Sequence, residues 1–346
     1  MAWTINNGKL YFNTVLYTGN GGTQSITSLD FAPNWVWIKS RSTVRNNVLN
    51  DTVRGATKNL FSNTTGAEAT DTETLTSFNS DGFTLGDSAK VNENGTTFAS
   101  WNWKAGTSFT NDASATGIGS IDSSGSVSTD AGFSIITYTG TGSAATVAHG
   151  LGVAPKMIIN RTISAAKDWI TYHASLGATK FVELDTTDAA STSSDKFNNT
   201  EPTSTVFSIE SSSQNNTSGG TCLAYCFAEK KGYSKFGSYT GNGNADGTFV
   251  YTGFKPAFVL IKVTSTTNDW EIHDNKRGSS NVINAILQPN LSDAESTSGR
   301  EIDFLSNGFK LRNSNSQNNL SGGTFIYMAF AENPFTTSTG VPACAR

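Results

Sequence analysis

The chain has 346 residues, a net charge of −4 and 15% charged residues, well below the roughly 25% of an average globular protein. This balance excludes the basic surface that nucleic-acid binding requires. No apolar run approaches the roughly 20 residues of a membrane-spanning helix, and the first eight residues lack the basic and apolar regions of a signal peptide. Ser, Thr, Asn and Gly supply most of the polarity, which favours strands and turns over long helices.

A pattern of aromatic, glycine, proline and basic residues occurs three times. Each copy begins with Tyr-Thr-Gly, at 17–19, 138–140 and 239–241. A proline then precedes an apolar run, a basic residue follows the proline by 6 positions, and a glycine follows it by 22. The repeat-defining positions are Pro33, Lys39 and Gly55, then Pro155, Arg161 and Gly177, then Pro256, Lys262 and Gly278. This constant spacing predicts a triplicated unit.

The repeat divides the chain into tandem domains, each long enough to bury its own core. We expect repeats at 1–107, 132–231 and 232–335, a Ser/Thr/Gly-rich connector with a possible hairpin at 108–131, and a C-terminal tail at 336–346. The connector explains why the first repeat interval is 121 residues (138 minus 17) and the second is 101 residues (239 minus 138).

The elements follow the same order in each copy. An alternating, aromatic-rich strand leads into a Gly-rich turn, and the proline then precedes a continuous apolar run that predicts a buried strand. Asp81-Gly82 and Asn307-Gly308 predict tight hairpins. The best helix candidate is 48–60. The pattern as a whole predicts an all-β fold of three tandem antiparallel β-sandwich repeats of jelly-roll type.

Four tryptophans alternate in pairs on two predicted strands, so that each pair shares one face of its strand. They are Trp35, Trp37, Trp101 and Trp103. Such a pair forms part of a core or an exposed platform on which sugar rings stack. Apolar residues at the matching positions of the other copies favour the core.

Lys39, Arg161 and Lys262 keep a positive charge at one place in every copy. One interpretation is a contact with a partner carboxylate or an anionic sugar. The favoured interpretation is a charge at the end of a strand. Such a charge protects the sheet or pairs with a nearby carboxylate, namely Asp51, Asp168 or Asp269.

The three histidines give little support for catalysis. They are His149, His173 and His273. A nucleophile–base pair needs an activated Ser or Cys and an orienting carboxylate, and no Gly-x-Ser-x-Gly motif is present. We expect satisfied histidines on the surface or in loops.

Other candidate sites are equally weak. The 241–247 segment resembles an oxygen-rich calcium loop, but it lacks the acidic spacing of an EF-hand and is expected to be a turn. Several carboxylates would act as an acid–base pair only if folding placed two across a cleft at about 5 to 9.5 Å; they are Glu68, Asp71, Glu73, Asp293 and Glu295. No phosphate or dinucleotide motif appears. We therefore predict no catalytic residue, metal or cofactor.

The cysteines indicate unpaired thiols. Cys222 and Cys226 lie four positions apart in a predicted strand, which separates them by about 13 Å, too far for a disulfide. The third, Cys344, lies in the tail. Free thiols fit synthesis in a reducing cytoplasm.

Five segments together resemble a known repeat domain: Tyr-Thr-Gly-Asn-Gly at 17–21, the strand at 33–39, Val-Arg-Gly-Ala-Thr-Lys at 53–58, 63–68 and 78–83. The sequence is similar to a repeat domain of virion proteins, found in tail-fibre and other appendage proteins of marine bacteriophages, cyanophages among them. The resemblance covers about residues 12 to 335, and the segment at 149–158 resembles its second copy.

This resemblance implies a non-enzymatic structural protein of a phage particle, made in the host cytoplasm. A tail-associated fibre or spike component is favoured, which contacts the host surface or other tail proteins. Its Ser/Thr/Asn-rich loops suit hydrogen bonding to glycans, and by analogy it forms a homo-oligomer, most simply a trimer. The alternatives are a capsid-decorating or connector protein and a glycan depolymerase with a carboxylate-lined groove.

Overall fold

The computed structural model describes residues 7–331, so the predicted tail at 336–346 and Cys344 lie outside the described residues. Twenty-six strands, five α-helices of four residues each and one 3-10 turn (Gly8–Leu10) are present in this range. All paired strands run antiparallel in several open sheets. The predicted all-β, antiparallel sandwich fold is confirmed.

Each repeat contributes one large sheet. The first has the order β1 (Phe12–Thr18), β9 (Thr97–Trp103), β3 (Trp35–Ser40), β4 (Val48–Asp51), β5 (Lys58–Phe61), β6 (Ala69–Thr70). The second has the order β10 (Thr107–Asn111), β11 (Ser123–Ser128), β12 (Phe133–Thr139), β19 (Thr221–Phe227), β14 (Met157–Thr162), β15 (Ile170–His173), β16 (Lys180–Glu183), β17 (Ser191–Thr192). The third has the order β20 (Ser234–Thr240), β26 (Thr324–Ala331), β22 (Pro256–Val263), β23 (Trp270–Asp274).

A small sheet covers one face of each large sheet and closes a sandwich with its own apolar core. The small sheets are β2 (Gln24–Ile26), β8 (Gly82–Leu85) and β7 (Leu75–Asn79); β13 (Ala145–Ala148) and β18 (Val206–Ile209); β21 (Phe249–Tyr251), β25 (Gly308–Leu311) and β24 (Ile302–Leu305). The short helices are α1 (Ala89–Asn92), α2 (Ala113–Thr116), α3 (Ser194–Phe197), α4 (Ser213–Asn216) and α5 (Ser316–Asn319).

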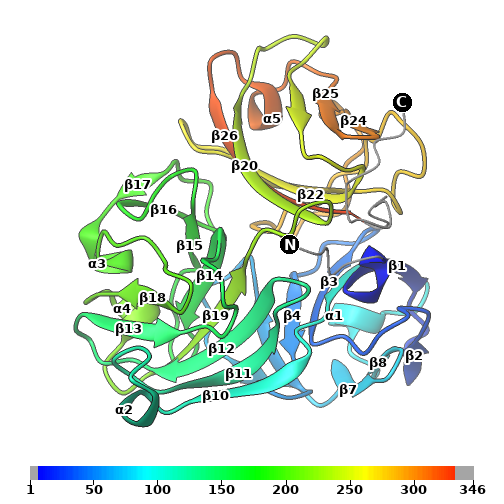
Figure 1. Ribbon diagram of the computed structural model, residues 1–346. Coiled ribbons are helices and arrows are strands. Elements are labelled where there is room, and N and C mark those ends of the chain that lie inside the picture. The colour runs from blue at the N-terminus through cyan, green and yellow to red at the C-terminus, as the bar shows by residue number, and fades with distance from the viewer. Residues whose placement is uncertain (1–6, 332–346) are drawn as a thin grey trace.

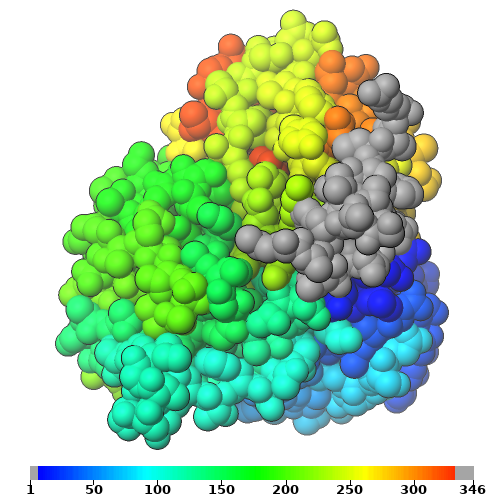
Figure 2. All heavy atoms as spheres, in the orientation of Figure 1, coloured from blue at the N-terminus to red at the C-terminus, as the bar shows by residue number. Residues whose placement is uncertain are grey.

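The opposite faces of the three large sheets pack against one another around a common centre, as Figure 1 shows. This shared core is rich in aromatic rings. Trp35 of the first repeat lies 4.3 Å from Tyr225 of the second, measured between ring centroids. Trp103 lies 5.7 Å from Phe258 of the third repeat, and Phe227 lies 6.2 Å from Phe330. The three sandwiches therefore form one body, visible in space-filling view in Figure 2.

The four tryptophans lie in this shared core, each at most 1% exposed. Their prediction as core residues is confirmed, but the core that they fill lies between repeats. On β3, Trp35 and Trp37 face the shared core, whereas Val36 and Ile38 face the sandwich of the first repeat. Every residue of β3, β14 and β22 is buried, because each of these strands has an apolar layer on both sides.

The predicted helix at 48–60 is wrong. This segment forms β4 and most of β5, joined by a tight turn in which Gly55 has φ +98°. That left-handed conformation suits glycine and ends any helix. In the connector, β10 and β11 form an antiparallel hairpin that extends the second large sheet.

The Tyr-Thr-Gly motif has the same structural role in all three repeats. The tyrosine hydroxyl donates to a carbonyl in the helical turn before the last strand: Tyr17 to Val91 at 2.8 Å, Tyr138 to Asn215 at 2.6 Å and Tyr239 to Asn318 at 2.7 Å. The glycine passes so close to this turn that a Cβ atom on Gly19 would lie 2.3 Å from the Glu93 oxygen. The motif therefore fixes a loop against a helix.

A buried asparagine completes this loop in each repeat, at Asn92, Asn216 or Asn319. The Asn319 amide donates to Asn242 Oδ1, the Asn244 carbonyl and the Asn313 carbonyl at 2.7 to 3.1 Å. Truncating Asn319 to Ala removes the donor from all three acceptors, and we expect the free energy of unfolding to fall by about 2 kcal/mol. Urea denaturation measures this loss. Substitution of exposed Asn244 by Ala is the control and should change stability by less than about 0.5 kcal/mol.

Candidate functional site

The three repeated cations join the repeats to one another. Lys39 Nζ donates to the Arg45 carbonyl at 2.6 Å and to the Ser292 carbonyl of the third repeat at 2.8 Å. Arg161 donates to the carbonyls of Thr64, Thr65 and Gly66 in the first repeat at 2.7 to 3.3 Å. Lys262 Nζ donates to the Thr187 carbonyl of the second repeat at 2.8 Å and to the Asn268 carbonyl. Each repeat thus holds a loop of the preceding one, and the first holds the third.

These cations are fully buried. Burial lowers the pKa of the Lys39 and Lys262 amines to about 8 and that of the Arg161 guanidinium to about 10. Their hydrogen bonds go to backbone carbonyls and not to Asp51, Asp168 or Asp269, so the predicted pairing with these carboxylates is wrong. A buried cation is also inaccessible to an anionic sugar, which removes the binding interpretation.

Two further positions close the same cycle. The residue 14 positions after each proline donates to the preceding repeat: Trp169 to the Phe61 carbonyl at 2.8 Å, Trp270 to the Glu183 carbonyl at 2.9 Å, and Asn47 to the Leu291 carbonyl at 2.8 Å.

The residue 18 positions after each proline contacts the last strand of the following repeat. The contacts are Asp51 with Tyr225 at 2.8 Å, His173 with the Tyr327 carbonyl at 3.2 Å, and Asp274 with Trp101 at 3.0 Å.

The remaining repeat-defining residues shape turns. Pro33, Pro155 and Pro256 are buried at or just before the starts of β3, β14 and β22. Gly177 has φ +77°, in the same left-handed region as Gly55. A Cβ atom on Gly278 would lie 2.9 Å from the Ile283 side chain. None of these positions presents a reactive side chain.

The three histidines are buried. His149 lies in the loop after β13, in keeping with the expectation of a loop position, whereas His173 and His273 lie in β15 and β23 and are neither on the surface nor in loops. The Nδ1 atoms of His149 and His173 accept backbone N–H groups, and their Nε2 atoms face backbone carbonyls. Burial lowers the pKa of each to about 4. His273 lies 3.1 Å from the Glu271 carboxylate inside the third sandwich. The structure therefore brings none of the three to a surface groove.

The other suggested sites also have structural partners. The 241–247 segment is the loop held by Asn319, as its prediction as a turn requires. Glu68 lies 3.4 Å from Arg54, Asp71 lies 2.7 Å from Lys90, and Glu295 lies 2.8 Å from Arg41. Within 7–331 no group of three or more His, Cys, Asp or Glu side chains could hold a metal ion. Cys222 and Cys226 are buried free thiols, which confirms that they do not pair.

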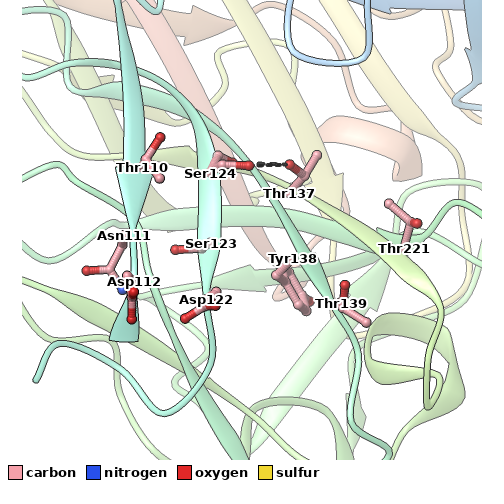
Figure 3. A pocket seen from close by; sticks show the side chains of 10 residues that line it. All are labelled: Thr110, Asn111, Asp112, Asp122, Ser123, Ser124, Thr137, Tyr138, Thr139 and Thr221. Carbon is pink, nitrogen blue, oxygen red and sulfur yellow. Dashed lines mark hydrogen bonds between the residues drawn. The ribbon is translucent and has the colours of Figure 1, made fainter. Parts of the chain in front are cut away.

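A groove lined by Ser, Thr, Asn, Asp and Tyr residues on the second repeat is the candidate site that the structure adds. Its volume is about 310 Å³, and Figure 3 shows its lining. The lining residues come from β10, β11, β12 and the start of β19: Thr110, Asn111, Asp112, Asp122, Ser123, Ser124, Thr137, Tyr138, Thr139 and Thr221. The groove depends on β10 and β11, and thus on the connector that lengthens the first repeat interval.

Hydrogen bonds fix two carboxylates at one end of the groove. Asp112 Oδ1 accepts from the Ser114 hydroxyl at 2.7 Å and from the Ala115 N–H at 3.0 Å, which caps α2. Asp122 Oδ1 accepts from the Ala113 N–H at 2.8 Å. On the adjoining wall the hydroxyls of Ser124 and Thr137 lie 3.3 Å apart, drawn as a dashed line in Figure 3.

The groove is suited to hydrogen bonding with a polar ligand. Hydroxyls both donate and accept, and carboxylates accept, as sugar hydroxyls require. The Ser114 hydroxyl and then the Ala115 N–H lower the pKa of Asp112, whereas a catalytic acid needs a raised one. Neither carboxylate is evident as a site residue from the sequence, because the connector shows only a low-complexity composition.

In the described part of the chain, no helix has the length and apolarity to cross a membrane. Comparisons with curated proteins and with solved structures give no significant match. A family model described as a domain of unknown function, DUF7483, matches residues 7–334. That match covers all three repeats as one unit, in keeping with their shared core, and the chain therefore belongs to the DUF7483 family.

Proposed function

We propose that this protein is a non-enzymatic structural component of a bacteriophage particle. The favoured location is the tail, where a fibre or spike component contacts the host surface or other tail proteins. The five sequence segments that resemble phage appendage repeats are the basis for this proposal.

The observation that supports it best is the closed cycle of three sandwiches around one core. A virion component must keep its shape outside the cell without chaperones or turnover. Buried contacts at Lys39, Arg161 and Lys262 tie every repeat to the next, so that one sandwich cannot open without disrupting a neighbour. The groove of the second repeat lies outside this rigid framework and offers hydroxyls and carboxylates to a glycan or a protein loop.

A capsid-decorating or connector role is the second candidate. The three repeats surround a common centre with equivalent contacts, which approximates threefold symmetry within one chain. Such a body matches a threefold position on a capsid lattice or a tail junction. This symmetry gives the second candidate its specific support.

A reconstruction of intact particles from the source phage tests both. We expect density for three β-sandwiches at the tail, with the groove of the second repeat facing solvent or another tail protein. Density at repeated positions over the capsid would replace the tail proposal with the decoration role. A particle that lacks the chain would contradict both.

A further inference from the structure

The third repeat carries two exposed aromatic side chains on its small sheet. β21 pairs only with β25 and is therefore an edge strand. Phe249 is 44% exposed and Tyr251 is 60% exposed, whereas Val250 between them is buried. Because side chains alternate along a strand, both rings lie on the outward face of the sheet. A single exposed apolar side chain is common on protein surfaces, but a cluster of large exposed apolar groups often marks a binding surface.

Two glycines lie beside the rings. A Cβ atom on Gly308, which lies opposite Tyr251 in the ladder, would meet first the Val250 carbonyl oxygen at 2.1 Å and then the Phe249 ring at 3.1 Å, so the close approach of the two strands requires this glycine. A Cβ atom on Gly253 would lie 3.5 Å from the Tyr251 hydroxyl, an ordinary contact distance. The backbone of the hairpin leaves both rings exposed.

The other two repeats have no such pair. In the register of the small sheets, Ile26, Val147 and Val250 are equivalent. The flanking residues are Ser25 and Thr27 in the first repeat and Thr146 and the buried Ala148 in the second. In the second repeat the connector also covers the strand edge, through a hydrogen bond of 2.9 Å from the Ser120 N–H to the Thr146 carbonyl. The sandwich therefore folds without these aromatics, and the fold does not explain them.

A cavity of about 270 Å³ adjoins Tyr251. Its lining includes Glu229, Lys231, Lys235 and Tyr251. Lys235 Nζ lies 2.9 Å from Glu229 Oε1, and both side chains are about one third exposed. An ammonium has three donors and a carboxylate accepts up to about four hydrogen bonds, so this pair retains capacity for a ligand. The cavity is slightly smaller than the roughly 300 to 1,000 Å³ of sites for drug-sized ligands.

We propose that this surface binds a neutral saccharide. The C–H face of one pyranose ring stacks on Tyr251, and its hydroxyls hydrogen-bond to Glu229 and Lys235 in the cavity. The Glu229 carboxylate repels a phosphate or another anion placed beside it, whereas each sugar hydroxyl can donate to this carboxylate and accept from a lysine ammonium. Phe249, two residues along the strand and about 6.6 Å away, extends the aromatic surface under a second sugar ring.

This inference rests on the proposed function, because a saccharide site matters in a phage particle only if the protein contacts a host glycan. Binding itself is independent of where the chain lies in a particle. If saccharides bind but the particle lacks the chain, only the proposed function fails. If the chain lies in the tail but no saccharide binds, only this inference fails.

The test is saturation-transfer NMR on the full chain with the methyl glycosides of glucose, galactose, mannose and N-acetylglucosamine, and with cellobiose and lactose. We expect transfer to at least one probe, an apparent Kd about tenfold weaker for Tyr251→Ala, and retained binding for Tyr251→Phe. Glu229→Gln should also weaken binding. Lack of transfer to every probe would overturn the inference, as would unchanged binding by Tyr251→Ala. A virion protein seated on Phe249 and Tyr251 in the particle reconstruction would overturn it as well.

Discussion

Acidification from pH 7 to 4 is expected to lower the free energy of unfolding by about 3 kcal/mol for each of His149 and His173. Burial holds both pKa values at about 4 in the folded protein, against about 6.5 in an unfolded chain. Above pH 6.5 both states are neutral and the contribution is complete. As pH falls from 6.5 towards 4 the unfolded state takes up protons first, so stability is lost across that window.

Burial is the cause of the lowered pKa values, and the hydrogen bonds at Nδ1 also favour the neutral rings. Nδ1 of His173 accepts the Ser175 N–H at 3.1 Å, and Nδ1 of His149 accepts the Leu151 N–H at 3.2 Å. A proton on either nitrogen would face a donor, and the buried charge would lack compensation.

Urea unfolding, followed by tryptophan fluorescence at several pH values between 7 and 5, measures about two thirds of this loss, about 2 kcal/mol for each histidine, before most carboxylates titrate. The double variant His149→Gln/His173→Gln is the control, because it removes both titrating groups. It should be less stable at pH 7 but show a shallower dependence on pH. A flat stability profile in the unaltered protein, or the same slope in both proteins, would contradict the prediction.

Replacing Arg161 by Met should cost about 3 to 5 kcal/mol. The methionine keeps much of the side-chain length but leaves the carbonyls of Thr64, Thr65 and Gly66 without these donors in a buried seam. The guanidinium also lies 4.8 Å from the centre of the Trp169 ring, and that contact is lost too. Chemical denaturation measures the loss, and faster hydrogen exchange in the loop at 64–68 would locate it between the first and second repeats.

The chain itself supplies the matched control for this position. Lysine occupies the equivalent place in the other two repeats, where Lys39 and Lys262 each bind backbone carbonyls. Arg161→Lys should therefore recover most of the stability, whereas Arg161→Met should not. Equal stability of both variants would show that the buried charge contributes little to holding the repeats together.

The sequence predicted the strands well, because glycines and prolines in turns separate them and each element occurs in three copies that can be compared. It failed at 48–60, where apolar residues of two short strands fall at helix-like intervals. The distinction depends on Gly55, whose left-handed turn becomes evident only once β4 and β5 pair. The local pattern of apolar residues does not reveal such a turn.

The shared core was beyond the sequence prediction, although one signal for it was present. On β3 the Trp35 and Trp37 face and the Val36 and Ile38 face are both apolar, which requires cover on two sides. A two-layer sandwich supplies only one cover. The segment that covers the second face is set by contacts between residues more than 100 positions apart, such as Trp101 with Asp274. Local periodicity does not reveal such contacts.

The candidate groove was hidden for a different reason. Its Ser, Thr and Asp residues have the composition of a flexible linker, and only pairing of β10 and β11 with β12 turns them into one wall. The exposure of the β21 aromatics could not be predicted either, since an alternating aromatic strand is as typical of a core as of a surface.

The closed cycle has an evolutionary consequence. The contacts of the third repeat with the first, such as Arg41 with Glu295 at 2.8 Å, span a junction that no peptide linker bridges directly. That junction therefore has the form of a subunit interface, like the one that three separate copies of a single repeat would form in a homotrimer. In a homotrimer every substitution appears three times, but a fused chain lets each copy diverge alone. The second repeat carries the groove and the third the aromatic face, while each seam keeps a buried cation that donates to the backbone of another repeat.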